Sequence, residues 1–216
     1  MKSILVFCWA FFMSTFIFAQ GVPTAILKSH YIFLAFKKGT VLLKSGAKQE
    51  VLLNYNSLTE EMIFEDNGTR LALAEPQSVD TVFIQNRKFI PGNKMFYEVI
   101  TNTPVFLLAR HICDVGTVAN GANVGYGGTS QTAAANARSA VISMGQRYDL
   151  QLPDDYVITP TMEFVLRRYK TDFLIKNAKQ VAKVFPEKSN DIKKFVKENN
   201  TNFAIQEDVL KLIQIL

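Results

Sequence analysis

Between residues 40 and 113, apolar and polar positions alternate in short runs separated by turn residues, which is the pattern of strands with one buried face. The stretch SLTEEMIFEDNGTRLAL, residues 57–73, is the clearest example. Asn67 and Gly68 suit a two-residue turn in which both residues have positive φ, and such a turn defines the register of the hairpin. The expected cross-strand pairs are Glu65 with Arg70, Phe64 with Leu71 and Met62 with Leu73. One face of the hairpin is then apolar, and the other carries paired charges.

The four acidic residues of this stretch raise the alternative of a carboxylate metal site. A calcium loop requires alternating oxygen ligands before its glycine and a bidentate Glu after it. The segment Glu65-Asp66-Asn67-Gly68 lacks that spacing. We therefore assign the acidic residues to strand pairing, and we expect no metal and no cofactor.

Three further turn signals separate the neighbouring strands. They are Ser45-Gly46, Gly92-Asn93 and Asn102-Thr103-Pro104. The Gly92-Asn93 turn predicts the pairs Phe89 with Phe96 and Arg87 with Glu98. Residues 40–114 are thus expected to form an antiparallel meander of about eight strands, curled into a roll or open barrel that covers its apolar face. VFLLA, residues 105–109, is apolar on both faces and is expected near the centre of the sheet.

After Asp114 the composition changes, and residues 115–150 are dominated by Gly, Ala, Asn, Thr and Ser. This composition predicts a long polar loop. Its glycines do not form a nucleotide-binding motif, because no Lys-Ser or Lys-Thr follows them and the glycine spacing fails at its last position. Loops on a rigid sheet often carry recognition, so Tyr126 and Arg138 are the candidate partner-binding residues.

Residues 151–216 return to a regular pattern. MEFVLRRY and DFLI predict a short hairpin through Lys170 and Thr171. Asn177 suits the N-cap of a first helix, and Pro186 suits the first turn of a second. Three apolar stripes at helical spacing predict three amphipathic helices: Val181, Val184 and Phe185, then Ile192, Phe195 and Val196, then Val209, Leu210, Leu212 and Ile213. The predicted fold class is α+β, and whether the helices pack on the sheet or form a separate lobe stays open.

Residues 1–19 have the form of an export signal. Lys2 precedes an apolar run from Ile4 to Phe18, and Ala19 offers a cleavage point. The run is shorter than the roughly 20 residues of a transmembrane helix. We therefore expect an exported protein, periplasmic or secreted, with no stable membrane span after cleavage. Residues 20–39 would then lead into the sheet.

The number of thiols and the net charge argue against two further features, an internal disulfide and a nucleic-acid partner. Cleavage would remove Cys8 and leave Cys113 as the sole thiol, so an internal disulfide is not expected. The net charge of +5 falls by one with Lys2, which is too balanced to indicate a nucleic-acid partner. Lysines near the helical stripes alternate with acidic residues, and we interpret them as a solvated face. They are Lys176, Lys179, Lys183, Lys193, Lys194 and Lys197.

Several segments resemble a recurring series in exported, uncharacterised proteins of Bacteroidetes-type bacteria. They are NYNSLTEEMIFEDNG, VDTVFIQNRKFIP followed by FYEV, YGGTSQT, LPDDY, and FPEKSNDIKKFVKENN with DVLKL. The resemblance covers most of the chain after residue 19. It implies a lineage, export and a two-part build, and it supplies no catalytic residue.

The candidate catalytic residues are His111 and Cys113, because residues two apart on a strand point to one face. Thiol catalysis also needs a base within hydrogen-bonding distance and a third group that orients the base, which the sequence does not identify. We therefore favour a non-catalytic binding or scaffolding module. The alternative is a hydrolase or thiol enzyme with its site near these two residues.

A protein partner is favoured over a glycan. Sugar rings usually bind to an aromatic platform, and Trp9, the only tryptophan, would leave with the export signal. The platform would then depend on tyrosines, namely Tyr31, Tyr55, Tyr126, Tyr148 and Tyr156.

Overall fold

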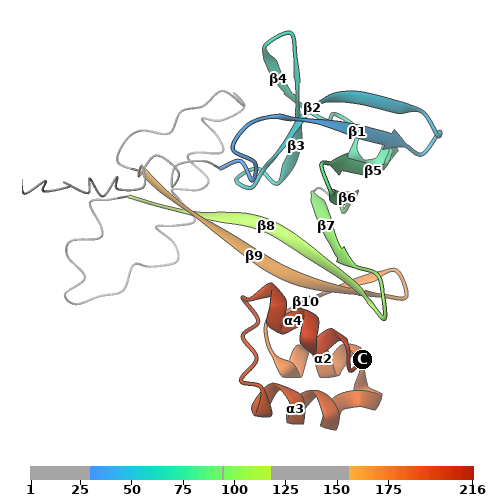
Figure 1. Ribbon diagram of the computed structural model, residues 1–216, viewed down its shortest axis with the longest axis vertical. Helices are drawn as coiled ribbons and strands as arrows, with labels where there is room; N and C mark the ends of the chain where they lie inside the picture. Colours follow the sequence, from blue (N-terminus) through green and yellow to red (C-terminus); the bar gives the residue numbers. More distant parts are fainter. Residues whose placement is uncertain (1–29, 94, 118–155) are drawn as a thin grey trace, which may run out of the picture.

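The computed structural model of the protein describes residues 30–93, 95–117 and 156–216. In these residues, one large antiparallel sheet is followed by three helices near the C-terminus, so the α+β class is confirmed (Figure 1). The strands are β1 (Lys37–Leu43), β2 (Lys48–Asn56), β3 (Glu61–Asp66), β4 (Thr69–Ala72), β5 (Val79–Ile84), β6 (Arg87–Pro91), β7 (Phe96–Thr101), β8 (Phe106–Thr117), β9 (Tyr156–Arg168) and β10 (Thr171–Ile175). The helices are α2 (Ala178–Val184), α3 (Ser189–Glu198) and α4 (Gln206–Ile213), with 3₁₀ turns η2 (Pro76–Ser78) and η4 (Pro186–Lys188). None of the described helices has the length and apolar character that crossing a membrane demands.

The strands lie in the order β10-β9-β8-β7-β6-β5-β1-β2-β3-β4. The predicted continuous meander is wrong at one connection, because β5 pairs with β1 and not with β4. This pairing places Val82 beside Val41 in the buried interior, whereas β4 is short and its Leu71 is exposed. Burial of an apolar face decides the pairing here, against the general preference for consecutive neighbours. Among the described strands, β4 and β10 each pair on one side only, so the sheet is open.

The hairpin predicted around Asn67 and Gly68 is confirmed. The pairs of β3 and β4 are Ile63 with Ala72, Phe64 with Leu71, Glu65 with Arg70 and Asp66 with Thr69. Both turn residues have positive φ, 49° and 79°. Arg70 Nε lies 3.3 Å from Glu65 Oε2, and Met62 on the other face is fully buried. Glu65 therefore forms an ion pair with Arg70 across the two strands.

The register predicted for the β6–β7 hairpin is wrong by two residues. The observed pairs are Phe89 with Glu98, Ile90 with Tyr97 and Pro91 with Phe96. The Gly92 N–H donates a hydrogen bond to the Met95 carbonyl at 2.7 Å, which moves the turn one residue toward the C-terminus. The Tyr97 ring packs against Gly92, where a Cβ would lie 2.7 Å from the ring. Because a shift of two residues keeps each side chain on its face, Phe89 and Phe96 still share one core.

Most of the predicted hairpin strand MEFVLRRY belongs to a longer strand, β9. All 12 residues of β8 pair with β9. The ladder includes Thr117, so strand structure continues past Asp114. The turn from β9 to β10 consists of Tyr169 and Lys170, one residue earlier than predicted. The C-terminal part of the chain therefore continues the sheet of the N-terminal part.

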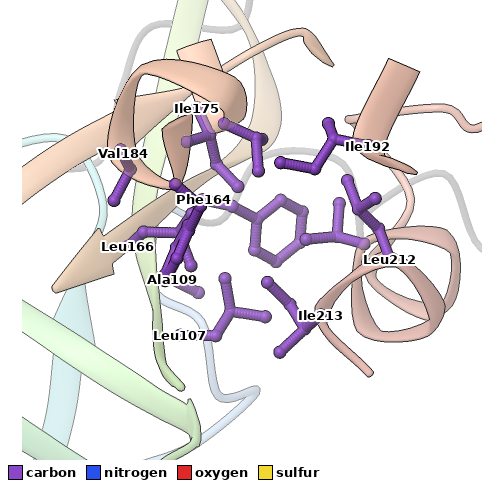
Figure 2. Close-up of a cluster of buried hydrophobic side chains, with 12 residues drawn as sticks. Leu107, Ala109, Phe164, Leu166, Ile175, Val184, Ile192, Leu212 and Ile213 are labelled. Carbon is purple, nitrogen blue, oxygen red and sulfur yellow. The ribbon is translucent and has the colours of Figure 1, made fainter. Parts of the chain in front are cut away.

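The three helices pack on the sheet, which answers the question that the sequence left open. Asn177 caps α2 as predicted, because its side-chain oxygen accepts a hydrogen bond from the Gln180 N–H at 3.0 Å. Phe164 of β9 projects into the core between the sheet and the helices (Figure 2). The buried members of this core are Leu107, Ala109, Phe164, Leu166, Ile175, Val181, Val184, Phe185, Ile192, Val209, Leu212 and Ile213. Each fully buried large side chain contributes about 1.5–3 kcal/mol, so this core holds the helices on β8, β9 and β10.

A second core lies among the strands from β1 to β7. Its buried members are Phe33, Val41, Leu53, Tyr55, Met62, Val79, Val82, Ile84, Phe89 and Phe96. The buried side chain of Asn54 accepts a hydrogen bond from the Phe33 N–H and donates one to the Phe33 carbonyl. These two bonds hold the segment before β1 against β2, so that Phe33 contributes to the core.

We expect Phe164→Ala to lower the free energy of unfolding by about 3–5 kcal/mol, because it leaves a cavity in the core that the helices cover. Phe173→Ala on the neighbouring strand β10 is the matched control. The Phe173 side chain is 37% exposed, and its loss should cost less than about 1 kcal/mol. Guanidinium denaturation measures both values, and equal losses would contradict the packing of the helices on β9.

Candidate functional site

His111 and Cys113 both lie on β8, but their partners differ. The His111 Nε2 is 2.6 Å from Glu98 Oε2 and 3.0 Å from Arg87 Nη2. Cys113 is fully buried in a small apolar cluster that includes Leu58. Within the described residues, the imidazole therefore has a carboxylate as its hydrogen-bonding partner, and the thiol is closed off from solvent.

Arg87, Glu98 and His111 form what we call the central charged cluster. The Arg87 Nε and Nη2 atoms lie 2.7 Å and 2.5 Å from the two carboxylate oxygens of Glu98. The guanidinium also lies over the rings of Phe33 and Phe89, 5.0 Å and 5.4 Å from their centroids. Such cation–π contacts and the bidentate ion pair both stabilise a partly buried Arg. The cluster thus joins β6, β7 and β8 to the second core.

The charge state of Glu98 follows from these contacts. Burial alone would raise the pKa of Glu98, but hydrogen bonds from His111 and Arg87, and the positive charge of Arg87, lower it to about 2. The carboxylate is therefore ionised near neutral pH and is a weak base. In this arrangement it orients the imidazole and pairs with the guanidinium, which is a structural task.

A second set of charges, the Arg110 network, lies between the β2–β3 turn and β9. Arg110 Nε and Nη2 are 2.6 Å and 2.8 Å from the two oxygens of Glu60. Its Nη1 is 3.3 Å from Glu163 Oε2, and Lys176 Nζ is 2.5 Å from Glu163 Oε1. The hydrogen bonds to Glu60 raise the pKa of Arg110 further above its already high value. Both oxygens of Glu163 are therefore engaged by cations.

Next to this network, a groove of about 630 Å³ lies between β9, the end of β10 and the connection from α3 to α4. We call it the β9–β10 groove. Its lining residues are Thr161, Met162, Glu163, Ile175, Lys176 and residues 200–204. In Figure 1 the α3–α4 connection runs along one side of the helices toward β9. Apolar and polar groups are mixed in the groove, so it can bind a ligand that carries both.

The α3–α4 connection is held in place by its own hydrogen bonds. The Asn202 side-chain oxygen accepts from the Ala204 N–H at 2.9 Å, and Asp208 accepts from the Asn202 N–H at 3.0 Å. Phe203 packs against the helix-facing core. This wall of the groove is therefore formed before any ligand binds.

The opposite wall is an edge of the sheet. Strand β10 ends at Ile175, opposite Phe164, while β9 extends further. In the part of the chain that the structure describes, residues 158–163 of β9 pair with β8 on one side and with no strand on the other. We call this segment the open edge of β9. The groove lies along it, at Thr161, Met162 and Glu163.

The sequence did not identify this groove. Tyr126 and Arg138, the predicted partner-binding residues, lie outside the described residues. Lys176, which the charge pattern places on a solvated face, is exposed, and it also lines the groove and pairs with Glu163. The sequence does contain one usable signal, Pro160 within a strand, which is typical of an edge.

Among the described residues, no three His, Cys, Asp or Glu side chains are grouped so that they could hold a metal ion. Comparisons of the chain with family models, with curated proteins and with solved structures gave no match. The function is therefore inferred from the geometry of the site.

Iodoacetamide should label Cys113 slowly in the folded protein near neutral pH, because the thiol is fully buried. The same reaction in concentrated guanidinium is the control and should be fast. Peptide mapping by mass spectrometry separates Cys113 from Cys8. Fast labelling of the folded protein would support a thiol enzyme instead.

Glu98 should contribute stability that is lost in acid. Its folded pKa of about 2 is below the ordinary value of 4.5, so the contribution is complete above about pH 4.5 and disappears as the pH falls toward 2. The shift corresponds to about 3 kcal/mol. Between about pH 5 and pH 2, the free energy of unfolding should fall more steeply in the wild type than in Glu98→Gln.

Glu65→Gln, at a more exposed carboxylate paired with Arg70, is the control for this comparison. It should keep the steep acid dependence of the wild type, because the central charged cluster is intact. The same pH dependence in Glu98→Gln and in the wild type would show that Glu98 is not the group that titrates.

Proposed function

We propose that the protein is a non-catalytic binding module of the bacterial cell envelope or exterior, and that its β9–β10 groove binds a protein partner. The observation that carries this proposal is the groove of about 630 Å³ along the open edge of β9. Preformed concave sites that mix apolar surface with a few placed polar groups are where proteins usually bind ligands. Both walls of this groove belong to described residues of the fold.

The charges at the groove favour a neutral ligand over an anionic polymer. Lys176 would be the natural partner of an anion, but its ammonium group already pairs with Glu163. The other oxygen of Glu163 pairs with Arg110. An acidic ligand would have to replace these ion pairs, whereas an uncharged polypeptide would leave them intact.

The lining of the groove favours a polypeptide over a sugar. Among the described residues that line it, Phe203 is the aromatic one, and that ring packs against the helix-facing core. A ring engaged in this way is poorly placed to stack on a sugar. Amide and hydroxyl groups from Asn202 and Thr161 suit the backbone and polar side chains of a protein partner.

The alternative is a hydrolase or thiol enzyme near His111 and Cys113, and one observation favours it. The 2.6 Å contact between Glu98 and His111 resembles the base and orienting group of a catalytic triad. The nucleophile of that scheme would be a buried thiol, which is a poor starting point for catalysis. The iodoacetamide experiment above decides between the two functions at this position.

We also propose that the strands from β1 to β8 form a roll. Its support comes from contacts between the β2–β3 region and β8: Glu60 binds Arg110, and the Tyr55 ring lies 6.1 Å from the His111 ring. Export through residues 1–19, which lie outside the described residues, and the Bacteroidetes-type lineage also belong to the proposal.

The test is selection of peptides from a random linear library displayed on phage, with the full chain as bait. Ala204→Trp places a large side chain at an exposed position of the groove and should reduce the recovery of enriched peptides at least about tenfold. Ala74→Trp, at an exposed alanine between β4 and η2, is the matched control and should leave recovery unchanged.

Thermal unfolding of both variants shows whether each one is folded. Peptides recovered equally by the wild type and by folded Ala204→Trp would bind elsewhere and would contradict the groove. A library without enriched peptides would contradict the protein partner itself.

A further inference from the structure

We propose that the partner binds by adding a β-strand to the open edge of β9, in line with β10, as an extended segment with the pattern polar–apolar–polar. This inference rests on the proposed function and specifies how the groove recognises its ligand. An unpaired strand edge presents N–H and C=O groups at a regular spacing, and an extended polypeptide complements them. The direction of these backbone groups follows from the β9–β10 turn.

Tyr169 and Lys170 form a two-residue turn in which both residues have positive φ, 52° and 63°. In such hairpins the residues that flank the turn, here Arg168 and Thr171, exchange both backbone hydrogen bonds. Every second residue of β9 then directs its N–H and C=O toward the β10 side. Met162, six residues before Arg168, follows this alternation, so its N–H and C=O point into the groove.

Pro160 gives independent support for the same alternation. It lies two residues before Met162 and opposite Cys113 of β8. Proline has no N–H, so in a strand it is tolerated where that group would face away from a ladder. In this alternation an N–H at position 160 would point to the open edge of β9. Its absence in Pro160 therefore leaves the ladder between β8 and β9 complete.

The side chains around the groove set the pattern of the partner. Residues opposite each other in neighbouring strands project to the same face. The partner residue opposite Met162 therefore points toward Ile175 and Phe203, which belong to the helix-facing core or pack against it. The residues on either side point to the face of Thr161 and Glu163, where polar groups are available.

The added strand is short. It begins where β10 ends, opposite Phe164, and Pro160 offers a C=O but no N–H at the other end. That distance is about four residues, or about 13 Å at the rise of a strand. Three positions of the partner fall within it, opposite Glu163, Met162 and Thr161, so an apolar residue between two polar ones fills this length.

The experiment uses capped, uncharged heptapeptides in which polar and apolar residues alternate, with scrambled sequences of the same composition as controls. Their dissociation constants are measured with the full chain. The tightest peptide is then methylated at one backbone nitrogen at a time. Methylation of the apolar residue opposite Met162 should weaken binding about tenfold, because it removes a hydrogen bond to β9, and methylation of the polar residue on either side should have little effect.

Amide exchange by NMR gives a second measurement that needs no variant. In the free protein the Met162 amide should exchange faster than those of Thr161 and Glu163, which donate to β8. The peptide should slow exchange at Met162 and leave the other two unchanged. Equal protection of all three amides in the free protein would overturn the proposed direction of the backbone groups.

The outcomes separate this inference from the proposed function. If peptides bind and Ala204→Trp blocks them, but methylation is tolerated at every position, strand addition is wrong and the groove function stands. If neither the heptapeptides nor the displayed library binds through the groove, both are wrong. A concentration-dependent dimer that Ala204→Trp abolishes in sedimentation velocity would assign the edge to a second copy and overturn the proposed partner.

Discussion

Strands β8 and β9 pair along all 12 residues of β8, and this ladder joins the two halves of the molecule. On one side of it, β7 continues the sheet toward the second core. On the other side, β9 supplies Phe164 and Leu166 to the core that the helices cover. Without this ladder, the helices would lack the apolar surface on which they pack, because their own stripes are too short to bury one another.

The ladder also determines where the charges lie. Strand β8 carries Arg110 and His111, and the β2–β3 turn and β7 supply the carboxylates that bind them. Partly buried charges are stable only when they are paired and hydrogen-bonded, so these groups serve the junction of the strands. One of the two candidate catalytic residues, His111, is therefore bound to Glu98 at this junction. In the β9–β10 groove, the charges of Lys176, Glu163 and Arg110 compensate each other.

The groove results from unequal strand lengths. Strand β9 has 13 residues and β10 has 5, so more than half of β9 has no neighbour on that side among the described strands. The turn at Tyr169 and Lys170 brings β10 back at once, and Asn177 starts α2 two residues after β10 ends. The chain therefore leaves the sheet early, and the α3–α4 connection forms the facing wall. An exposed edge is costly unless it is protected or used, which is why we propose a partner for it.

Local chemistry decided several elements that the sequence predicted correctly. The Asn67-Gly68 hairpin, the Asn177 cap and the three helices depend on residues within one turn or one hairpin of each other. The tertiary structure decided the pairing of β5 with β1, the β6–β7 register and the β9–β10 groove. These features depend on which distant apolar faces are buried together and on where neighbouring strands stop. Turn propensity and periodicity carry no information about either, because both act over only a few residues.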